Sequence, residues 1–426
     1  MIRLARTLRV AVALTLVAAC TDDLVAPGVC PEFCPTTEIQ VVDTLLATSI
    51  VDDTSFRGYV AAHEALLMLA ADLGGGVESR VVTTTTGVPT RYRFLPDTAT
   101  GAVLGVDSLL IRLIIQRRDS SARDTRVSFY RLPLTIDSAT TFADLAADFT
   151  VPIRTVALDS LLALPGRRDT LTGDSVLFDS TTGVVTLLAS FDSTQVPYTV
   201  ADSGKLGIGV RVSADTLAGP GRGSLAVGQA AGLSGTWFMR VDSLAIDTVQ
   251  RGQPIRTTFD SYVTSQAPVA LDTSLAVGGT PTARSLIHVT FPSHIRDSSQ
   301  VLRATLTLIP ITAAVGAVSD SFRVAAQTIV TDLGAKSPLG GPFFNGDRSF
   351  FGSTTVRPGS LDTVFIDVTG PLRRWQADSG APTALMLRLD PEGTVLGEIR
   401  FASSDFPAMR PTLRVTYSPR FQFGRQ

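Results

Sequence analysis

The stretch Lys205-Leu206-Gly207-Ile208-Gly209-Val210-Arg211-Val212 alternates large apolar residues with small or charged ones. Successive side chains of a β-strand point to opposite faces of a sheet. A strand with this pattern buries one face and leaves the other in water. The stretch therefore predicts an antiparallel sheet that packs through one of its faces.

The same alternation recurs along the chain, in 109–115, 302–308, 364–368, 385–389 and 413–417. In 302–308 it predicts that Leu302, Ala304, Leu306 and Leu308 share one face. Hydrophobic residues make up 44% of the 426 residues and charged residues only 18%, which favours strands. The best candidate for a short helix is 141–148. We expect an all-β chain.

Two weakly similar halves suggest tandem domains. In each half a glycine-containing segment precedes a stretch that begins with arginine and ends with proline, 91–96 and 284–292, and a strongly alternating strand follows, at 108–116 and at 301–309. Gly252 and Pro254 interrupt the pattern between the halves. We predict two antiparallel, jelly-roll-like β-sandwiches, at residues 39–250 and 251–426.

Aspartate followed by serine or threonine recurs between the predicted strands, for example at Asp119-Ser120, Asp137-Ser138 and Asp202-Ser203. These short side chains bond to the nearby backbone and favour turns. The alternative is calcium binding, but no Asp-x-Asp-x-Asp-Gly loop occurs. The pattern indicates turns.

The first 19 residues have the organisation of a signal peptide. Arg3, Arg6 and Arg9 form a basic start, and an apolar stretch from Val10 to Ala19 follows, too short to span a bilayer of ~30 Å. The end, Leu16-Val17-Ala18-Ala19-Cys20, resembles the bacterial lipobox, which implies acylation of Cys20. The alternative is an ordinary secretory signal with a chance cysteine. We expect a lipid anchor in the cell envelope, with the outer membrane permitted.

Residues 20–38 form a proline-bearing tether with little to bury. Its two further cysteines, Cys30 and Cys34, are candidates for a small-loop disulfide in an oxidising envelope. Free or intermolecular thiols are the alternative. A redox motif would normally have two intervening residues, whereas this pair has three.

The second half resembles the DNRLRE domain of bacterial surface proteins across roughly residues 270–418. The residues that carry the resemblance are the strand 302–308, the segment 366–375 (Ile-Asp-Val-Thr-Gly-Pro-Leu-Arg-Arg-Trp), and the ending 399–405 with 410–417. The resemblance implies a jelly roll of the TGF-β-propeptide type, related to some carbohydrate-binding modules. The first half lacks the Asp-Val-Thr…Trp segment.

Pro371 suits the first turn of a short helix, and Leu372 and Trp375 lie three residues apart on one side of it. We predict that Trp375 fills the core at one end of the sandwich, and that Trp237 does the same on its strand. The alternative is an exposed platform on which a sugar ring stacks.

No familiar catalytic pattern emerges from the sequence. The three histidines are His63, His288 and His294, and His63-Glu64 lacks the second histidine of a zinc-protease helix. No Gly-x-Ser-x-Gly nucleophile turn occurs. We predict no enzyme activity, no cofactor and no metal. A glycosidase needs only two carboxylates, so a divergent polysaccharide hydrolase is kept as an alternative.

The net charge of −2 offers no overall attraction to nucleic acid. Nearly all basic residues are arginines, which indicates coding bias or, as the alternative, an arginine-based recognition surface. We predict a lipid-anchored envelope protein that binds polysaccharide or another envelope component. The alternative is an assembly scaffold for other envelope proteins.

Replacing Cys20 tests the anchor directly. A Cys20→Ser variant is expected to lack acyl chains and to be absent from the membrane fraction. A Cys30→Ser variant is expected to keep its acyl chains and to stay in the membrane fraction. Mass spectrometry of the mature protein and fractionation measure this. An intact Met1 or an unmodified Cys20 in the mature wild-type protein contradicts the prediction.

Overall fold

A computed structural model describes residues 40–420 apart from 47–48, 58–61, 74–76, 94–99, 200, 217–218, 221–222, 229–231, 243–247, 266–273, 281, 317–320 and 342–348. The described strands pair antiparallel throughout, and the few helices are short. The predicted all-β chain of antiparallel sheets is confirmed. Cys20, Cys30 and Cys34 lie outside the described residues.

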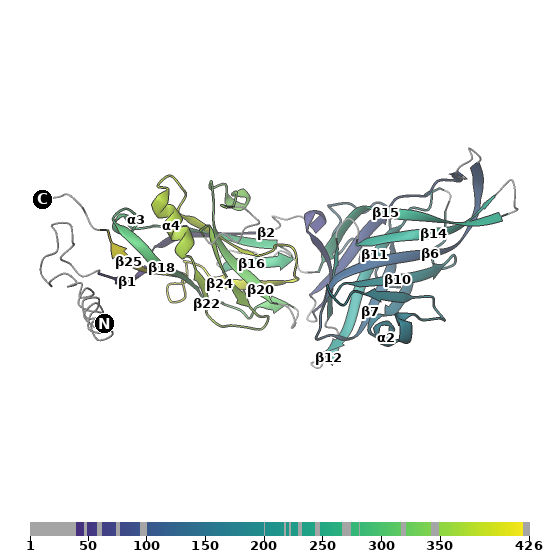
Figure 1. Ribbon diagram of the computed structural model, residues 1–426, viewed down its shortest axis with the longest axis horizontal. Helices are drawn as coiled ribbons and strands as arrows, with labels where there is room; N and C mark the ends of the chain where they lie inside the picture. Colours follow the sequence, from purple (N-terminus) through teal and green to yellow (C-terminus); the bar gives the residue numbers. More distant parts are fainter. Residues whose placement is uncertain are drawn as a thin grey trace, which may run out of the picture.

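The strands fall into two bodies, which Figure 1 shows side by side. We call them the sandwich unit and the ring unit. The elements of the sandwich unit are β1 (Val42–Leu46), β2 (Ile50–Arg57), β16 (Ser274–Thr280), β17 (Thr282–Val289), α3 (Ser293–Arg296), β18 (Ser299–Leu308), β19 (Val315–Gly316), β20 (Phe322–Thr328), η3 (Gly334–Lys336), β21 (Phe351–Val356), β22 (Val364–Asp367), α4 (Thr369–Ala377), β23 (Ala384–Leu389), β24 (Gly397–Ala402) and β25 (Thr412–Pro419).

Two sheets face each other in the sandwich unit. One has the order β1-β25-β18-β22, and the other has the order β19-β24-β16-β17-β23-β20-β21 with β2 paired to β17. Their inner faces share one core, to which Leu306, Ile366 and Leu413 contribute from the first sheet and Ile287 and Leu387 from the second.

The strand β2 lies between β17 and β16. It pairs with β17 from Ala283 to Val289, whereas β16 and β17 pair only beside their connecting turn. On the other side of β2, the Ser55 hydroxyl donates to the Ser274 carbonyl oxygen and accepts from the Ala276 N–H. The second sheet thus depends on a strand more than 200 residues away in sequence.

The ring unit consists of η1 (Ala62–Glu64), β3 (Leu67–Asp72), β4 (Glu78–Thr85), β5 (Arg91–Arg93), β6 (Thr100–Arg118), β7 (Arg123–Leu132), β8 (Arg154–Ala157), α2 (Leu158–Ala163), η2 (Pro165–Arg167), β9 (Ser175–Phe178), β10 (Val185–Asp192), β11 (Gly207–Thr216), β12 (Gly219–Pro220), β13 (Gly223–Gly228), β14 (Leu233–Asp242) and β15 (Thr248–Thr264). Pairing runs in a closed ring through β6, β14, β15, β4, β3 and β13. One continuous sheet thus wraps its own core.

The observed strand pairing differs from the predicted domain boundaries. Residues 42–46 and 50–57 were expected in the first domain, but β1 pairs with β25 and β2 with β17. Residues 251–264 were expected in the second domain, but β15 pairs with β14 and β4. Gly252 and Pro254 interrupt the apolar pattern without ending the strand, because their cross-strand partners on β14 still hold them in register. The ring unit is therefore an insertion between β2 and β16.

The two units touch through a small apolar cluster. Leu396 of the sandwich unit packs with Leu69, Ala71 and Ala226 of the ring unit. Beside it, the Arg117 guanidinium donates to the Thr394 carbonyl oxygen over 2.6 Å.

The alternating stretches form strands as predicted, with one difference. In β6, Leu109, Ile111, Leu113 and Ile115 are all buried. In β18 the register with β25 shifts between Val301 and Arg303, so Val301 is buried and Leu302 is 38% exposed. The prediction that Leu302 shares the buried face is wrong, because this bulge inserts one extra residue.

The predicted helix at 141–148 is wrong, since this segment forms successive turns. The aspartate turns are confirmed at several positions. The Asp119 carboxylate, for example, accepts from both the backbone N–H and the hydroxyl of Ser121. Asp107-Ser108, by contrast, lies inside β6.

Figure 1 places β1 and β25 at one end of the molecule and the ring unit at the other. The described chain thus begins and ends at the far end of the sandwich unit. None of the helices in the described part is long and apolar enough to cross a bilayer.

Two fragments test the insertion. A fragment of residues 251–426 lacks β1 and β2, which leaves the paired edges of β25 and β17 open, and we expect it to aggregate or to unfold without cooperativity. Residues 40–57 joined by a glycine-serine linker to 266–420 are expected to unfold cooperatively. Thermal unfolding followed by circular dichroism compares the two. Equally cooperative unfolding of both would contradict the insertion.

Candidate functional site

The helix α4 begins where β22 ends, and Asp367 holds this junction. Its carboxylate accepts from the Thr369 backbone N–H over 2.9 Å and from the Thr369 hydroxyl over 2.6 Å. Pro371 lies in the first turn, where a missing N–H costs nothing. The helix predicted from Pro371, Leu372 and Trp375 is therefore confirmed.

Both tryptophans are core residues, as predicted. Trp375 is 1% exposed and packs edge-on against Phe291, with 6.0 Å between ring centroids. Trp237 is fully buried, and its indole N–H donates to the Gly204 carbonyl oxygen. The alternative of a tryptophan platform for sugar is wrong, because neither ring reaches the surface.

One face of α4 covers the part of β18 that has no strand partner on the β22 side. β22 pairs with β18 only from Thr305 to Leu308, so the backbone before Thr305 needs other partners on that side. The Thr369 hydroxyl accepts from the Ala304 N–H over 2.8 Å. Arg373 donates from Nε to the Val301 carbonyl oxygen and from Nη2 to that of Leu302.

Gln376 completes this edge. Its Nε2 donates to the Ile295 and Ser299 carbonyl oxygens, each over 2.8 Å, and its Oε1 accepts from the Val301 N–H over 3.2 Å. The carboxamide is therefore engaged at both ends and ties α4 to α3 and β18. Its position, three residues after Arg373 and seven after Thr369, places all three side chains on one helix face.

A hollow of about 720 Å³ opens between α4 and β21. A Cβ on Gly352 would collide with the Asp367 carbonyl oxygen, so this glycine allows β21 to approach the end of β22. The lining mixes polar side chains with aromatic and other apolar surface, from Ser349, Phe350, Phe351, Gly352, Ser353, Asp367, Thr369, Gly370, Arg373, Arg374 and Ala377. The Arg374 guanidinium lies 5.6 Å from the Phe350 ring centroid.

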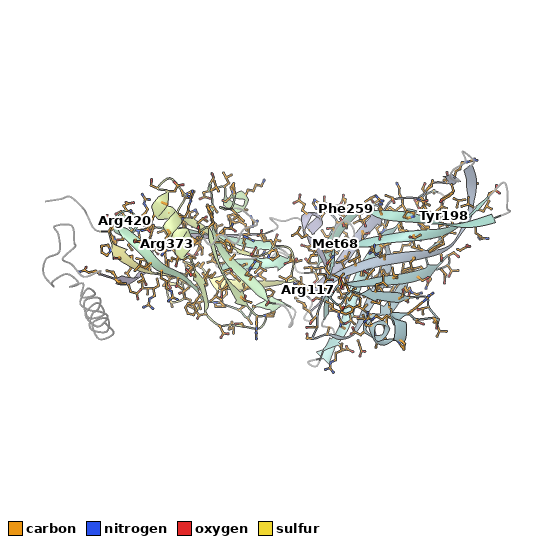
Figure 2. All side chains as sticks on the ribbon, in the orientation of Figure 1. Met68, Arg117, Tyr198, Phe259, Arg373 and Arg420 are labelled. Carbon is orange, nitrogen blue, oxygen red and sulfur yellow. The ribbon has the colours of Figure 1, made fainter. Side chains whose placement is uncertain are left out.

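A second hollow of about 410 Å³ shares Arg373 and Ala377 with the first, and its other lining residues are Gln300, Gln376 and Arg420. Figure 2 shows Arg373 and Arg420 beside α4, on the part of the sandwich unit away from the ring unit. We call the two hollows together the α4 groove. It consists of two adjoining open hollows of mixed polar and apolar lining, with Arg373, Arg374 and Arg420 along them.

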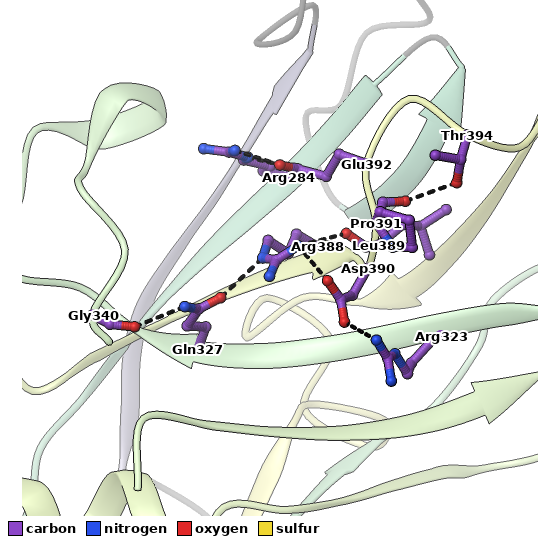
Figure 3. A network of polar contacts seen from close by, with 10 residues as sticks. All are labelled: Arg284, Arg323, Gln327, Gly340, Arg388, Leu389, Asp390, Pro391, Glu392 and Thr394. Atoms are coloured by element: carbon purple, nitrogen blue, oxygen red, sulfur yellow. Dashed lines mark hydrogen bonds and ion pairs between the residues drawn. The ribbon is translucent and has the colours of Figure 1, made fainter. Parts of the chain in front are cut away.

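Other charged side chains in the sandwich unit pair with one another inside the protein. Arg388 donates to Gln327 and Asp390, Asp390 also binds Arg323, and Arg284 binds Glu392 in a fork (Figure 3). Each of these charges has a partner of opposite sign or an amide, as buried charges require.

The three histidines are scattered. His288 bonds through Nε2 to Asp332 over 2.7 Å, and this bond lowers the pKa of the Asp332 carboxyl. His294 lies 6.0 Å from the Tyr417 ring, and His63 lies 6.4 Å from that of Phe259. Across the described ranges, no three histidine, cysteine or carboxylate side chains gather closely enough to hold a metal ion.

Comparison with known proteins adds little. No family model matches the chain, and no curated protein matches it. One similar solved structure is described as manganese lipoxygenase of Gaeumannomyces graminis with a partial structure of zonadhesin of Komagataella pastoris. It is 12% identical, with a TM-score of 0.12, over 88% of this chain and 85% of that chain. A likeness this low carries no argument. The DNRLRE resemblance stays a prediction.

Sequence reasoning singled out 366–375 for its tryptophan and missed Gln376, Arg373 and Phe350 as site residues. Once a helix begins at Thr369, the spacing of Thr369, Arg373 and Gln376 indicates a common face. No pattern in the sequence identifies Phe350, because its place beside Arg374 depends on two distant segments meeting.

Gln376 is expected to hold the groove together. Gln376→Leu leaves the Ile295 and Ser299 carbonyl oxygens and the Val301 N–H without their partner, and should lower the free energy of unfolding by about 1–3 kcal/mol. Gln300→Leu, at an exposed position in the same groove, is the matched control and should change little. Denaturant unfolding measures both. Equal stability of the two variants would show that Gln376 has no such role.

Proposed function

We propose that this chain is a non-catalytic lipoprotein, anchored through Cys20, whose sandwich unit binds envelope polysaccharide in the α4 groove. The observation that carries the proposal is the groove itself, open and continuous along α4. An extended polymer can enter such a depression from the side, whereas a small ligand is normally enclosed.

The lining of the groove suits a polyhydroxylated chain. Serine and threonine hydroxyls both donate and accept hydrogen bonds, as sugar hydroxyls do, and guanidinium groups add donors. Ser349 and Ser353 supply hydroxyls, and Phe350 supplies an aromatic ring. This combination of polar groups and an aromatic surface supports sugar binding without a tryptophan.

The small number of carboxylates in the groove favours binding over hydrolysis. A glycosidase needs two carboxyl groups ~5–10 Å apart across the scissile bond. Among the described residues that line the groove, Asp367 alone carries a carboxylate. That carboxylate already accepts two hydrogen bonds from Thr369. The alternative of a polysaccharide hydrolase finds no support in this site.

The position of the groove fits an anchored protein. Gln300 of the groove pairs with Ser418, and the neighbouring Val301 pairs with Tyr417, which also pairs with Val42 of β1. The groove thus lies beside the point where the tether joins the body. A tether from Cys20 to Val42 spans at most about 80 Å when extended. We infer that this end of the sandwich unit, with the bound polymer, stays within about 80 Å of the membrane.

A second function is favoured by the open edge of β1. This strand pairs with β25, and no other described strand pairs with it. Leu45 is 59% exposed there, and Val41, just before the strand, is 57% exposed. Such an edge can accept a strand from another protein, which would make the chain an assembly scaffold.

A protein of residues 21–426, which lacks the acyl chains, is expected to bind polysaccharides on a glycan array. Phe350→Ala removes the aromatic ring of the groove and should weaken retention by about tenfold, a loss of ~1.4 kcal/mol. Phe178→Ala in the ring unit, where the side chain is 38% exposed, is the matched control and should bind normally.

A blank array would contradict polysaccharide binding. If crosslinking through position 45 then captured one envelope protein reproducibly, and Leu45→Lys abolished the capture, the scaffold function would replace it. Equal binding by the Phe350→Ala variant and the wild type would move the binding site away from the α4 groove.

A further inference from the structure

We infer that the ligand of the α4 groove is an acidic polysaccharide, whose carboxylate or phosphate groups are bound by Arg373, Arg374 and Arg420. The inference rests on the proposed polysaccharide function and names the chemical class of its ligand. It depends on how the charges in the groove are partnered, and the following observations carry it.

The three arginines follow the length of the groove. Arg374 lines the larger hollow, Arg420 lines the smaller one, and Arg373 lines both. A ligand lying along α4 therefore meets three guanidinium groups in succession. A linear polymer with an acidic group on each repeat has the matching arrangement of charges.

Several other arginines of the sandwich unit are paired with carboxylates, whereas Arg303, Arg357 and Arg410 form no ion pair with any described residue. The partners are Glu398 for Arg57 and Arg400, Glu392 for Arg284, Asp390 for Arg323 and Arg388, and Asp43 for Arg414. These pairs neutralise their charges within the protein.

The groove arginines differ. Arg373 donates to the main-chain carbonyl oxygens of Val301 and Leu302, which leave its positive charge uncompensated. Arg420 forms no ion pair with any described residue. Arg374 bonds to Asp378 over 3.3 Å, but both side chains are 44% exposed, and an exposed pair of this kind contributes little.

Asp367 carries the only carboxylate among the described lining residues. That carboxylate accepts two hydrogen bonds from Thr369 at the start of α4. The groove therefore carries an excess of positive charge, although the whole chain has a net charge of −2. An anion that binds Arg373 or Arg420 gains attraction without displacing an internal ion pair, and a neutral sugar would not gain this attraction.

Arg373 is also preorganised. Two hydrogen bonds to the bulged part of β18 fix its guanidinium before any ligand arrives. Less side-chain entropy is lost on binding when a long side chain is already held. The planar guanidinium fork matches carboxylate and phosphate oxygens, which makes arginine more selective for these groups than lysine.

The experiment measures binding of residues 21–426 to four probes: polygalacturonate, phosphomannan, neutral dextran and phosphatidylglycerol vesicles. We expect binding to one or both acidic polymers, weakening as salt is added, and much weaker binding to dextran and vesicles. Carboxylate and phosphate ligands are distinguished by the first two probes.

Arg420→Gln and Arg374→Gln should each weaken binding of the acidic polymer by about tenfold. Neither side chain is buried, so the fold is expected to persist, and unchanged thermal unfolding checks this. Arg131→Gln, at an exposed arginine of β7 in the ring unit, is the matched control and should bind as the wild type does.

Four results would overturn the inference, and they have different consequences. Equal affinity for dextran and the acidic polymers, or normal binding by the Arg374 and Arg420 variants, removes the acidic ligand but leaves polysaccharide binding in place. Binding to vesicles alone assigns the arginines to lipid headgroups. Absence of binding to every glycan on the array removes the proposed function itself.

Discussion

The sandwich unit depends on how one strand edge is satisfied. β22 pairs with only the second half of β18, and the backbone groups of Val301, Leu302 and Ala304 would otherwise lack partners on that side. Thr369, Arg373 and Gln376 of α4 supply them. Because unsatisfied backbone groups at a partly buried edge are costly, this requirement fixes the position of α4. The groove beside α4 exists as a consequence.

The second constraint is the long-range placement of β2. This strand separates β16 from β17 and bonds to both, so the sheet closes only after the ring unit has been synthesised between them. Pairing across such a sequence distance is slow because loop closure must precede it. The ring unit also needs long-range pairing, between β4 and β15, but all of its strands precede β16 in the chain. It can form first and bring the two parts of the sandwich together.

The sequence was informative wherever one face of a strand alternates. It predicted the all-β class, the strands around Leu109 and Val210, and the buried place of Trp375. It could not predict the bulge that exposes Leu302, because alternation does not reveal which residue a partner strand leaves out. The domain boundaries failed for a related reason, since β1, β2 and β15 resemble strands of either unit. Only pairing partners distinguish them.

The bulge in β18 also affects the charge of the groove. The extra residue in β18 turns Leu302 outward and presents two neighbouring carbonyl oxygens to Arg373. An arginine bound to carbonyl oxygens has no counter-charge, whereas one bound to a carboxylate forms a pair with no net charge. The same hydrogen bonds that satisfy the strand edge therefore leave a fixed, uncompensated cation facing the groove. Arg373 therefore helps to satisfy the strand edge and, in the proposed function, is also one of the three arginines that bind the ligand.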